Sequence, residues 1–248
     1  MDRSKILLIV TGSNVSPWDK NWMECANTWI PLLKQLGYHV KVSIADENLD
    51  DYFLDECDII KFKSSVGKDG LFERGLTLPL RWILENTNYQ YYFKVDSDTF
   101  IHPKRFDNML IENIQDGFDY LGACTPYRGW DTNDNFKEHM LAKDGDFFFA
   151  SGAGYCISRR IMALVLNDLK IENHWELSCE DYILGRTMKN LGIPLLHDNK
   201  ICIESPFMEV LVKSADIKTP YIGDRDSHLA MQHYMHKNMS KAINDLIK

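Results

Sequence analysis

The chain has 248 residues, 45% of them hydrophobic, and a formal net charge of −8 at pH 7. This length fits one α/β domain or two small ones, and the hydrophobic content is sufficient for a globular core. The acidic balance excludes the basic surface of a nucleic-acid-binding protein and offers no basic run for anionic membranes. No stretch approaches the roughly 20 apolar residues of a transmembrane helix.

The N-terminal apolar run, Ile6 to Val10, predicts a buried first strand, because it is too short for the core of a signal peptide. Six cysteines are scattered without a Cys-x-x-Cys pair, so they are expected as small buried side chains rather than zinc ligands. We therefore expect a soluble, cytoplasmic protein. A place in the Golgi lumen would follow only if an anchor had been removed.

Hydrophobic periodicity predicts strands that alternate with helices along the first half of the chain. Strands are expected at 6–10, 38–44, 59–62, 91–95, 120–124 and 146–150, and helices at 22–36, 76–84, 103–114, 161–169 and 181–191. Gly37 and Gly192 are placed to end two of these helices. The pattern predicts a single α/β domain with a mostly parallel, doubly wound sheet and a less regular second half.

The strand expected at 91–95 runs directly into Asp96-Ser97-Asp98. Because side chains alternate along a strand, Asp96 and Asp98 would point to one face at its end. Two carboxylates suit Mg²⁺ or Mn²⁺, and such an ion usually keeps open coordination positions that diphosphate oxygens can fill. Ligands of such sheets lie beyond the carboxyl ends of the strands. The pattern thus indicates a metal site for a nucleotide-activated substrate, with an ordinary turn as the alternative.

Further candidates also have two interpretations each. Glu180-Asp181 at a predicted helix start suits either N-terminal capping or a general base that takes a proton from a hydroxyl. The small residues 151–154 indicate either a tight turn before a helix at Arg159 or a close backbone approach to a ligand. Lys94 and Arg74 would reach phosphates or form surface salt bridges.

Five segments in chain order resemble a known family: residues 9–11 with 25–29, 76–82, 92–100, 150–159 and 180–185. The chain is similar to GT-A-fold glycosyltransferases of the fringe and β1,3-galactosyltransferase-like group. This resemblance implies a Rossmann-like, mostly parallel central sheet flanked by helices. It also implies a nucleotide-sugar half at about residues 1–125 and an acceptor half at about 126–248. Ser97 stands where the family has aspartate, and the chain shows no family-type anchor.

The resemblance also implies roles for site residues. Asp98 would bind the metal, Mn²⁺ or Mg²⁺, with Asp96 near the ribose or the metal. Asp181 matches the catalytic base, with Glu180 as its neighbour. The segment around His228 resembles the family's C-terminal metal-binding histidine, although His233 and His236 are further candidates. Other residues expected at the donor are Thr11, Lys94, Gly152 and Gly154.

The expected activity is therefore a metal-dependent, inverting glycosyl transfer. A nucleotide diphosphate sugar, in the first place a UDP-sugar, would be the donor, and a hydroxyl of a glycan or glycoconjugate would be the acceptor. Two alternatives remain open at this point. The first is a metal-dependent nucleotidyltransferase or phosphohydrolase that uses the same aspartates. The second is a non-catalytic carbohydrate-binding module.

Overall fold

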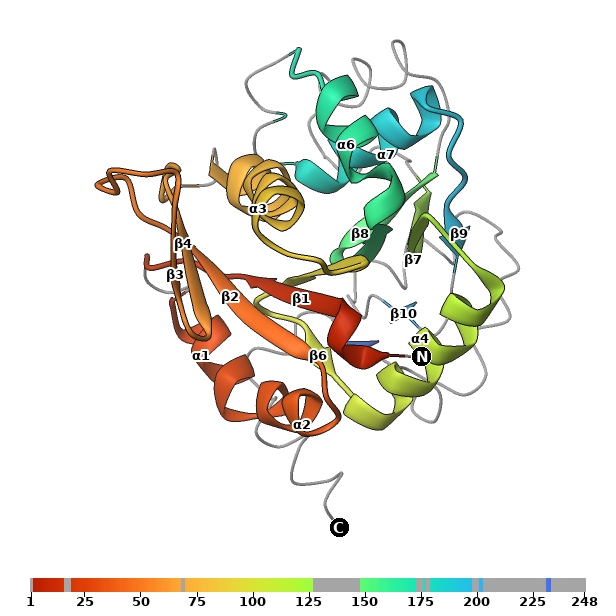
Figure 1. The fold of residues 1–248 in the computed structure, drawn as a ribbon, viewed down its shortest axis with the longest axis horizontal. Coiled ribbons are helices and arrows are strands. Elements are labelled where there is room, and N and C mark those ends of the chain that lie inside the picture. Colours follow the sequence, from red (N-terminus) through yellow and green to blue (C-terminus); the bar gives the residue numbers. More distant parts are fainter. Residues whose placement is uncertain are drawn as a thin grey trace.

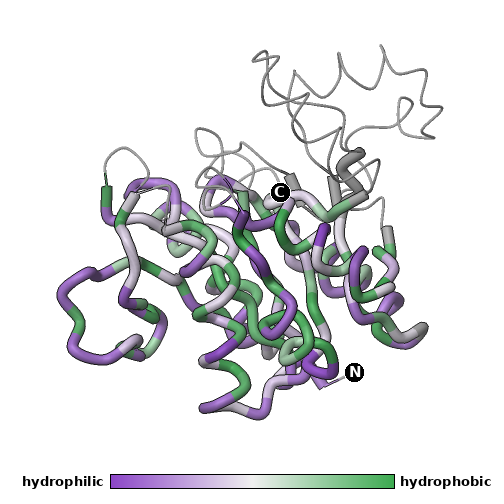
Figure 2. The backbone as a smooth tube through the Cα atoms, turned by 90° about the horizontal axis from the view of Figure 1, so that it is seen from above, coloured by the Kyte–Doolittle hydropathy of each residue, from purple (hydrophilic) through white to green (hydrophobic). Residues whose placement is uncertain are grey.

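The computed structural model describes residues 2–15, 19–67, 70–126, 148–172, 176, 179–197, 201–202 and 231–232. These residues form an α/β fold in which helices cover both faces of a central sheet (Figure 1). Hydrophobic stretches lie mostly inside this body and hydrophilic ones at its rim (Figure 2). None of the described helices is long and apolar enough to cross a membrane.

The central sheet has eight strands in the order β3-β4-β2-β1-β5-β8-β7-β9. The strands are β1 (Ile6–Thr11), β2 (His39–Ala45), β3 (Phe53–Glu56), β4 (Ile59–Phe62), β5 (Tyr91–Asp96), β7 (Tyr120–Pro126), β8 (Phe148–Ser158) and β9 (Leu196–His197). β4, β2, β1 and β5 are parallel neighbours, and β9 pairs in parallel with β7. The mostly parallel sheet predicted from the sequence is therefore confirmed. A small second sheet joins β10 (Ile201–Cys202), β11 (Met231–Gln232) and β6 (Phe100–Ile101).

Two strands run against the others: the edge strand β3 is antiparallel to β4, and β8 is antiparallel to both of its neighbours, β5 and β7. β8 is also longer than the expected strand at 146–150. The chain continues as strand through residues 151–154, since Tyr155, Cys156 and Ile157 are buried on both faces of the sheet. The tight turn proposed for 151–154 is therefore wrong. Because β8 is reversed, its first residues lie at the edge where β5 ends.

The helices divide into two layers that share the sheet between them. The helical elements are η1 (Arg3–Lys5), α1 (Asp19–Asn27), α2 (Trp29–Gln35), η3 (Glu73–Thr77), α3 (Leu78–Asn86), α4 (Pro103–Asp116), α6 (Arg159–Asp168) and α7 (Glu180–Asn190). Along β1, Leu8 and Val10 pack toward α1, α2 and α4, whereas Leu7 and Ile9 pack toward η3, α3, α6 and α7. This alternation is what a sheet buried on both faces requires.

The helix expected at 22–36 is interrupted at Thr28, whose φ of −119° and ψ of −88° are not helical. The hydroxyl of Thr28 donates to the carbonyl of Glu24 at 2.6 Å, and Pro31 has no N–H to continue the helical ladder. The break turns Trp29 into the core, where its indole N–H donates to the carbonyl of Thr99 at 3.1 Å. Gly37, with a φ of +94°, ends α2 as predicted.

The helix expected at 76–84 begins earlier and with a wider turn. η3 is a π-helical turn, closed by the Leu78 N–H to the carbonyl of Glu73. The carbonyl of Gly75 in this turn accepts the hydroxyls of Tyr92 at 2.6 Å and Tyr155 at 3.5 Å. Turns of this type frequently accompany functional sites, and this one faces the carboxyl edge of the sheet.

Candidate functional site

The strand β5 ends at Asp96, and a turn follows in which the Thr99 N–H donates to the carbonyl of Asp96 at 3.1 Å. Asp98 lies in this turn and not on the strand, so strand alternation does not apply to it. The backbone of Asp-Ser-Asp thus forms the turn of the alternative interpretation, and the metal site stays a prediction. The two residues that do share a strand face are Lys94 and Asp96. Cys25 supports the turn, since its thiol donates to the carbonyl of Ser97 at 3.1 Å.

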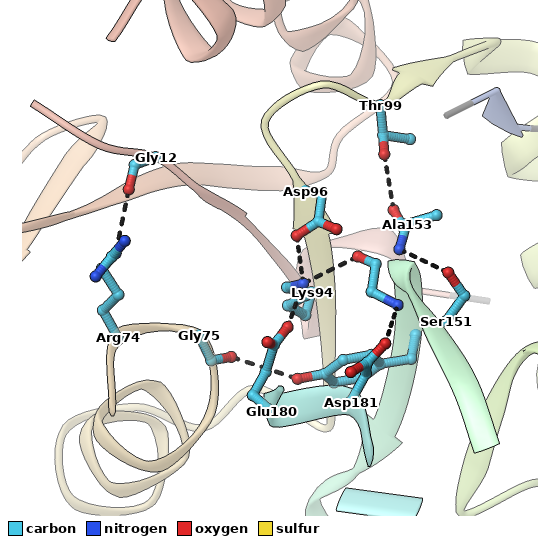
Figure 3. Close-up of polar contacts among 12 residues, drawn as sticks. Gly12, Arg74, Gly75, Lys94, Asp96, Thr99, Ser151, Ala153, Glu180 and Asp181 are labelled. Atoms are coloured by element: carbon cyan, nitrogen blue, oxygen red, sulfur yellow. Dashed lines mark hydrogen bonds and ion pairs between the residues drawn. The ribbon is translucent and has the colours of Figure 1, made fainter. Parts of the chain in front are cut away.

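Lys94 is buried, with 1% of its side chain exposed, and its ammonium lies among oxygen atoms (Figure 3). It donates to Asp96 Oδ1 at 2.5 Å and to the carbonyl of Gly152 at 2.9 Å, and it forms an ion pair with Glu180. Burial disfavours the charged ammonium, but the two carboxylates outweigh this and raise the pKa of Lys94. Lys94 is therefore a buried cation, not a surface salt bridge.

The β7–β8 ladder is irregular between Gly122 and Cys124, opposite residues 151–154 of β8. At this bulge, side chains bind the backbone of Gly152 and Ala153, and the bonds to Ala153 can be followed in Figure 3. The Gly152 N–H donates to Asp181 Oδ2 at 3.0 Å, and the Ala153 carbonyl accepts from the Thr99 hydroxyl at 3.1 Å. Bulges of this kind often adjoin active sites and redirect the groups around them.

Gly152 leaves no room for a side chain. A Cβ atom at this position would lie 2.8 Å from Asp96 Oδ2, 3.3 Å from Lys94 Nζ and 3.5 Å from Asp181 Oδ2. The groups that approach the backbone of Gly152 are the charged side chains of β5 and α7. The approach to a ligand expected for the small residues stays a prediction. Gly154 lies two residues further along β8 and pairs with Val95 of β5.

Glu180 and Asp181 begin α7, and their carboxylates have different surroundings. Glu180 is 5% exposed and its carboxylate faces Lys94. Asp181 accepts two backbone N–H groups, from Gly152 and, at 2.8 Å, from Tyr182 of its own helix. Both carboxylates lie in the first turn of α7, where the helix dipole favours negative charge, but the N-cap residue Cys179 makes no side-chain capping bond.

Burial raises the pKa of Asp181 to about 6, and the neighbouring charge of Glu180 acts in the same direction, while Lys94 and the two amides oppose them. A carboxyl group with a raised pKa is matched to proton transfer near neutral pH. Such perturbed carboxylates gather at functional sites. Of the two carboxylates at the start of α7, Asp181 is the one whose raised pKa suits the predicted role of general base.

Two hydroxyls lie at the carboxyl ends of β1 and β2, at the same edge of the sheet. Thr11 is level with Asp96 of β5 on one side and with Ser43 of β2 on the other. Within the described part of the chain, the buried hydroxyl oxygens of Thr11 and Ser43 have no hydrogen-bond partner. Buried polar groups of this kind call for an explanation, and a ligand hydroxyl or carbonyl is one. Ser43 was not singled out from the sequence, since a single serine in a strand carries no signal.

The guanidinium of Arg74, on η3, reaches across the ends of the same strands. It donates to the carbonyl of Gly12 at 3.3 Å (Figure 3). It also donates to the carbonyls of Ser65 at 3.0 Å and Gly67 at 2.9 Å. Arg74 is 3% exposed, and burial lowers its pKa. The surface salt bridge expected for this residue is therefore wrong, and its positive charge is held inside the site by neutral carbonyl oxygens.

Asp96 and Asp98 provide hard oxygen donors of the kind that Mg²⁺ and Mn²⁺ prefer. Among the residues that the structure describes, no three His, Cys, Asp or Glu side chains gather as a ligand cluster. The predicted ligand His228, like His233 and His236, lies outside the described residues. Two carboxylates fit an ion that takes its other ligands from diphosphate oxygens and water.

Comparisons with known proteins agree with this arrangement. A sequence model described as Galactosyltransferase matches residues 76–199, which is half of the chain and includes β5, β8 and the start of α7. No curated protein matches the sequence.

Solved structures of the same fold include a glycosyltransferase involved in the glycosylation of the major capsid of PBCV-1. It has a TM-score of 0.50 and 10% identity, over 97% of this chain and 99% of that one. The galactosyltransferase LgtC, solved with donor and acceptor sugar analogs, has a TM-score of 0.49 and 8% identity, over 97% and 95% of the two chains. The family match and the shared architecture lead to one assignment: the chain belongs to the galactosyltransferase family and is a GT-A-fold glycosyltransferase.

Proposed function

We propose that this protein transfers a sugar from a nucleotide diphosphate sugar, in the first place a UDP-sugar, to a hydroxyl of a glycan acceptor, with inversion. One observation carries the proposal. The end of β5, with Asp96, and the start of α7, with Asp181, meet at the carboxyl edge of the sheet across Gly152. A single-domain chain, with a donor half at 1–125 and an acceptor half at 126–248, belongs to this proposal.

The donor is assigned to the ends of β2, β1 and β5, where ligands of such sheets bind. Thr11 lies there with a hydroxyl that has no partner among the described residues, and Arg74 offers a positive charge for the nucleotide or its phosphates. Asp98 and Asp96 would hold Mn²⁺ or Mg²⁺, with His228 as the further ligand expected from the sequence. When bound, such an ion would neutralise charge on the departing diphosphate.

Asp181 is assigned the role of general base. It accepts the proton of the acceptor hydroxyl while that oxygen bonds to the anomeric carbon, and the bond from this carbon to the diphosphate breaks. The transition state is oxocarbenium-like, as in other reactions at this carbon. Inversion requires the base and the leaving group on opposite faces of the sugar. The proposal takes inversion from the family resemblance and assigns the leaving group to the end of β5 and the base to the start of α7.

A panel of nucleotide sugars with glycan acceptors, with and without Mn²⁺, tests the proposal. Transferred sugar in the product is expected. Release of phosphate or pyrophosphate without a glycosylated product would instead identify a phosphohydrolase or nucleotidyltransferase. Sugar binding that is unaffected by chelation and leads to no reaction would identify a binding module.

Two substitutions then test the assigned roles. Asp98→Asn should abolish metal-dependent turnover, whereas Asp181→Asn should remove transfer and largely retain donor binding. Asp58→Asn serves as the matched control, because Asp58 is 72% exposed and paired with Lys34 away from the site. Near-normal turnover of Asp98→Asn would refute its role at the metal.

A further inference from the structure

The buried ammonium of Lys94 contacts three elements of the site, β5, β8 and α7. We propose that Lys94 is a positioning residue, which holds Asp181 in place for proton removal through the backbone of Gly152. The inference rests on the proposed transfer reaction. It also differs from the role expected from the sequence, in which Lys94 contacts the donor.

Lys94 has no donor left for a phosphate. An ammonium carries three N–H groups, and the protein supplies three acceptors: Asp96 on β5, Glu180 on α7 and the carbonyl of Gly152 on β8. With 1% of its side chain exposed, Lys94 would have to break one of these bonds to contact a ligand. Its contacts instead fix three segments, distant in sequence, relative to one another.

The link from Lys94 to Asp181 passes through Gly152. The carbonyl of Gly152 accepts from Lys94, and its N–H donates to Asp181 Oδ2 at 3.0 Å. The ladder irregularity opposite residues 151–154 turns this residue's groups toward the side chains. The Thr99 hydroxyl holds the next carbonyl, that of Ala153, so the segment is fixed on both sides.

Glu180 and Asp181 thereby have separate tasks. Glu180 is buried against Lys94 and neutralises part of its charge, which removes it from the proton transfer. In the described part of the chain, Asp181 accepts backbone N–H groups from Gly152 and Tyr182, and each carboxylate oxygen retains a second lone pair for the acceptor hydroxyl. The sequence pair Glu-Asp is thus one positioning residue and one base.

A comparison of two backgrounds tests this role. Lys94→Met combined with Glu180→Gln removes the two buried charges together. Asp96, the other carboxylate partner of Lys94, remains, but its side chain is 30% exposed to solvent. In the wild-type background this pair of substitutions should lower kcat about 100-fold, the scale of a misplaced catalytic group. In the Asp181→Asn background the same pair should lower the residual kcat by less than about threefold, because the group that it positions is already disabled.

Lys41→Met is the matched control. Lys41 also bonds a carboxylate, Asp55, and a main-chain carbonyl, that of Cys57, but away from the site, so kcat should be unchanged. Equal losses from the Lys94 and Glu180 pair in both backgrounds would overturn the inference, since a general structural effect is independent of Asp181.

A second measurement decides the case in which the combined variant does not fold. Glu180→Gln alone retains Lys94 and its bonds to Asp96 and Gly152, so kcat should stay within about tenfold of wild type. A loss as large as that of Asp181→Asn would overturn the division of tasks. If wild-type protein transfers no sugar from any donor, the proposed function itself fails. If wild type is active and the losses are equal, only the role of Lys94 fails.

Discussion

Asp181→Asn should stabilise the folded protein at neutral pH, even though it removes the base. The substitution keeps the shape of the side chain and removes its charge. Burial raises the pKa of Asp181 from its ordinary value of 3.8 to about 6. A difference of about two pH units corresponds to a cost of about 3 kcal/mol for the ionised carboxylate in the folded state. Asparagine has one acceptor oxygen for the two N–H groups that Asp181 accepts, which costs about 1 kcal/mol. The net gain is about 2 kcal/mol.

The sign of this effect depends on pH. Because the folded-state pKa of Asp181 lies above its unfolded value, wild-type stability is highest below pH 4. It falls as the pH rises to about 6 and stays lower above that. The asparagine variant lacks this fall. Relative to wild type, its free energy of unfolding should be about 1 kcal/mol lower at pH 4 and about 2 kcal/mol higher at pH 8.

Urea denaturation between pH 4 and pH 8, in metal-free buffer, measures this difference. Asp58→Asn, at an exposed position, should show a difference from wild type that does not change with pH in the same way. If the difference between Asp181→Asn and wild type is equal at pH 4 and pH 8, the carboxylate is not destabilised by burial. Asp181 would then not be a base tuned to neutral pH.

Four further outcomes are expected. Below about pH 6, kcat should fall tenfold per pH unit, because Asp181 must be ionised to accept a proton; a flat profile between pH 4.5 and 8 would contradict its role. Gly152→Ala should lower kcat/KM about 100-fold in a steady-state assay, since the alanine Cβ would lie 2.8 Å from Asp96 Oδ2 and displace that carboxylate; normal turnover would show that the position of Asp96 is not critical. Arg74→Met should weaken binding of the free nucleotide diphosphate about tenfold or more by calorimetry, and unchanged affinity would remove Arg74 from the donor site. Asp107→Ala should cost about 2 kcal/mol of stability in urea denaturation, because its carboxylate binds two partners at 2.5 and 2.8 Å, and leave kcat unchanged.

Much of the sheet was predictable because its strands are short apolar runs bounded by turn residues. β4 was predicted at its observed bounds, and the helix α7 was predicted within a residue because Gly192, with a φ of +69°, ends it. The antiparallel direction of β8 is not predictable in this way, because it depends on pairing with β5, about 60 residues earlier in the chain. The glycines at 152 and 154 also suggested a turn, whereas the buried run that follows them continues the strand.

The candidate site was predictable as a set of residues but not as a network. Asp96, Gly152 and Asp181 were selected separately, and the structure brings them together. Nothing local showed that Lys94 would be buried, because a lysine is usually exposed and its two carboxylate partners come from different elements. The burial of Arg74, expected as a surface salt bridge, is unpredictable for the same reason, since only the fold brings the carbonyls of three loop residues to its guanidinium.

The π turn at Glu73–Thr77 also sets the rotation of the segment before it. A π turn contains about one residue more than an α turn, and each residue of a helix advances it by about 100°. Deletion of Gly75 would close the turn as α-helix, leave α3 packed as before and swing the side chain of Arg74 by about 100°. The guanidinium would then leave the carbonyl of Gly12, which it now contacts at 3.3 Å. The extra residue of the π turn thus determines whether the guanidinium of Arg74 enters the site or faces away from it.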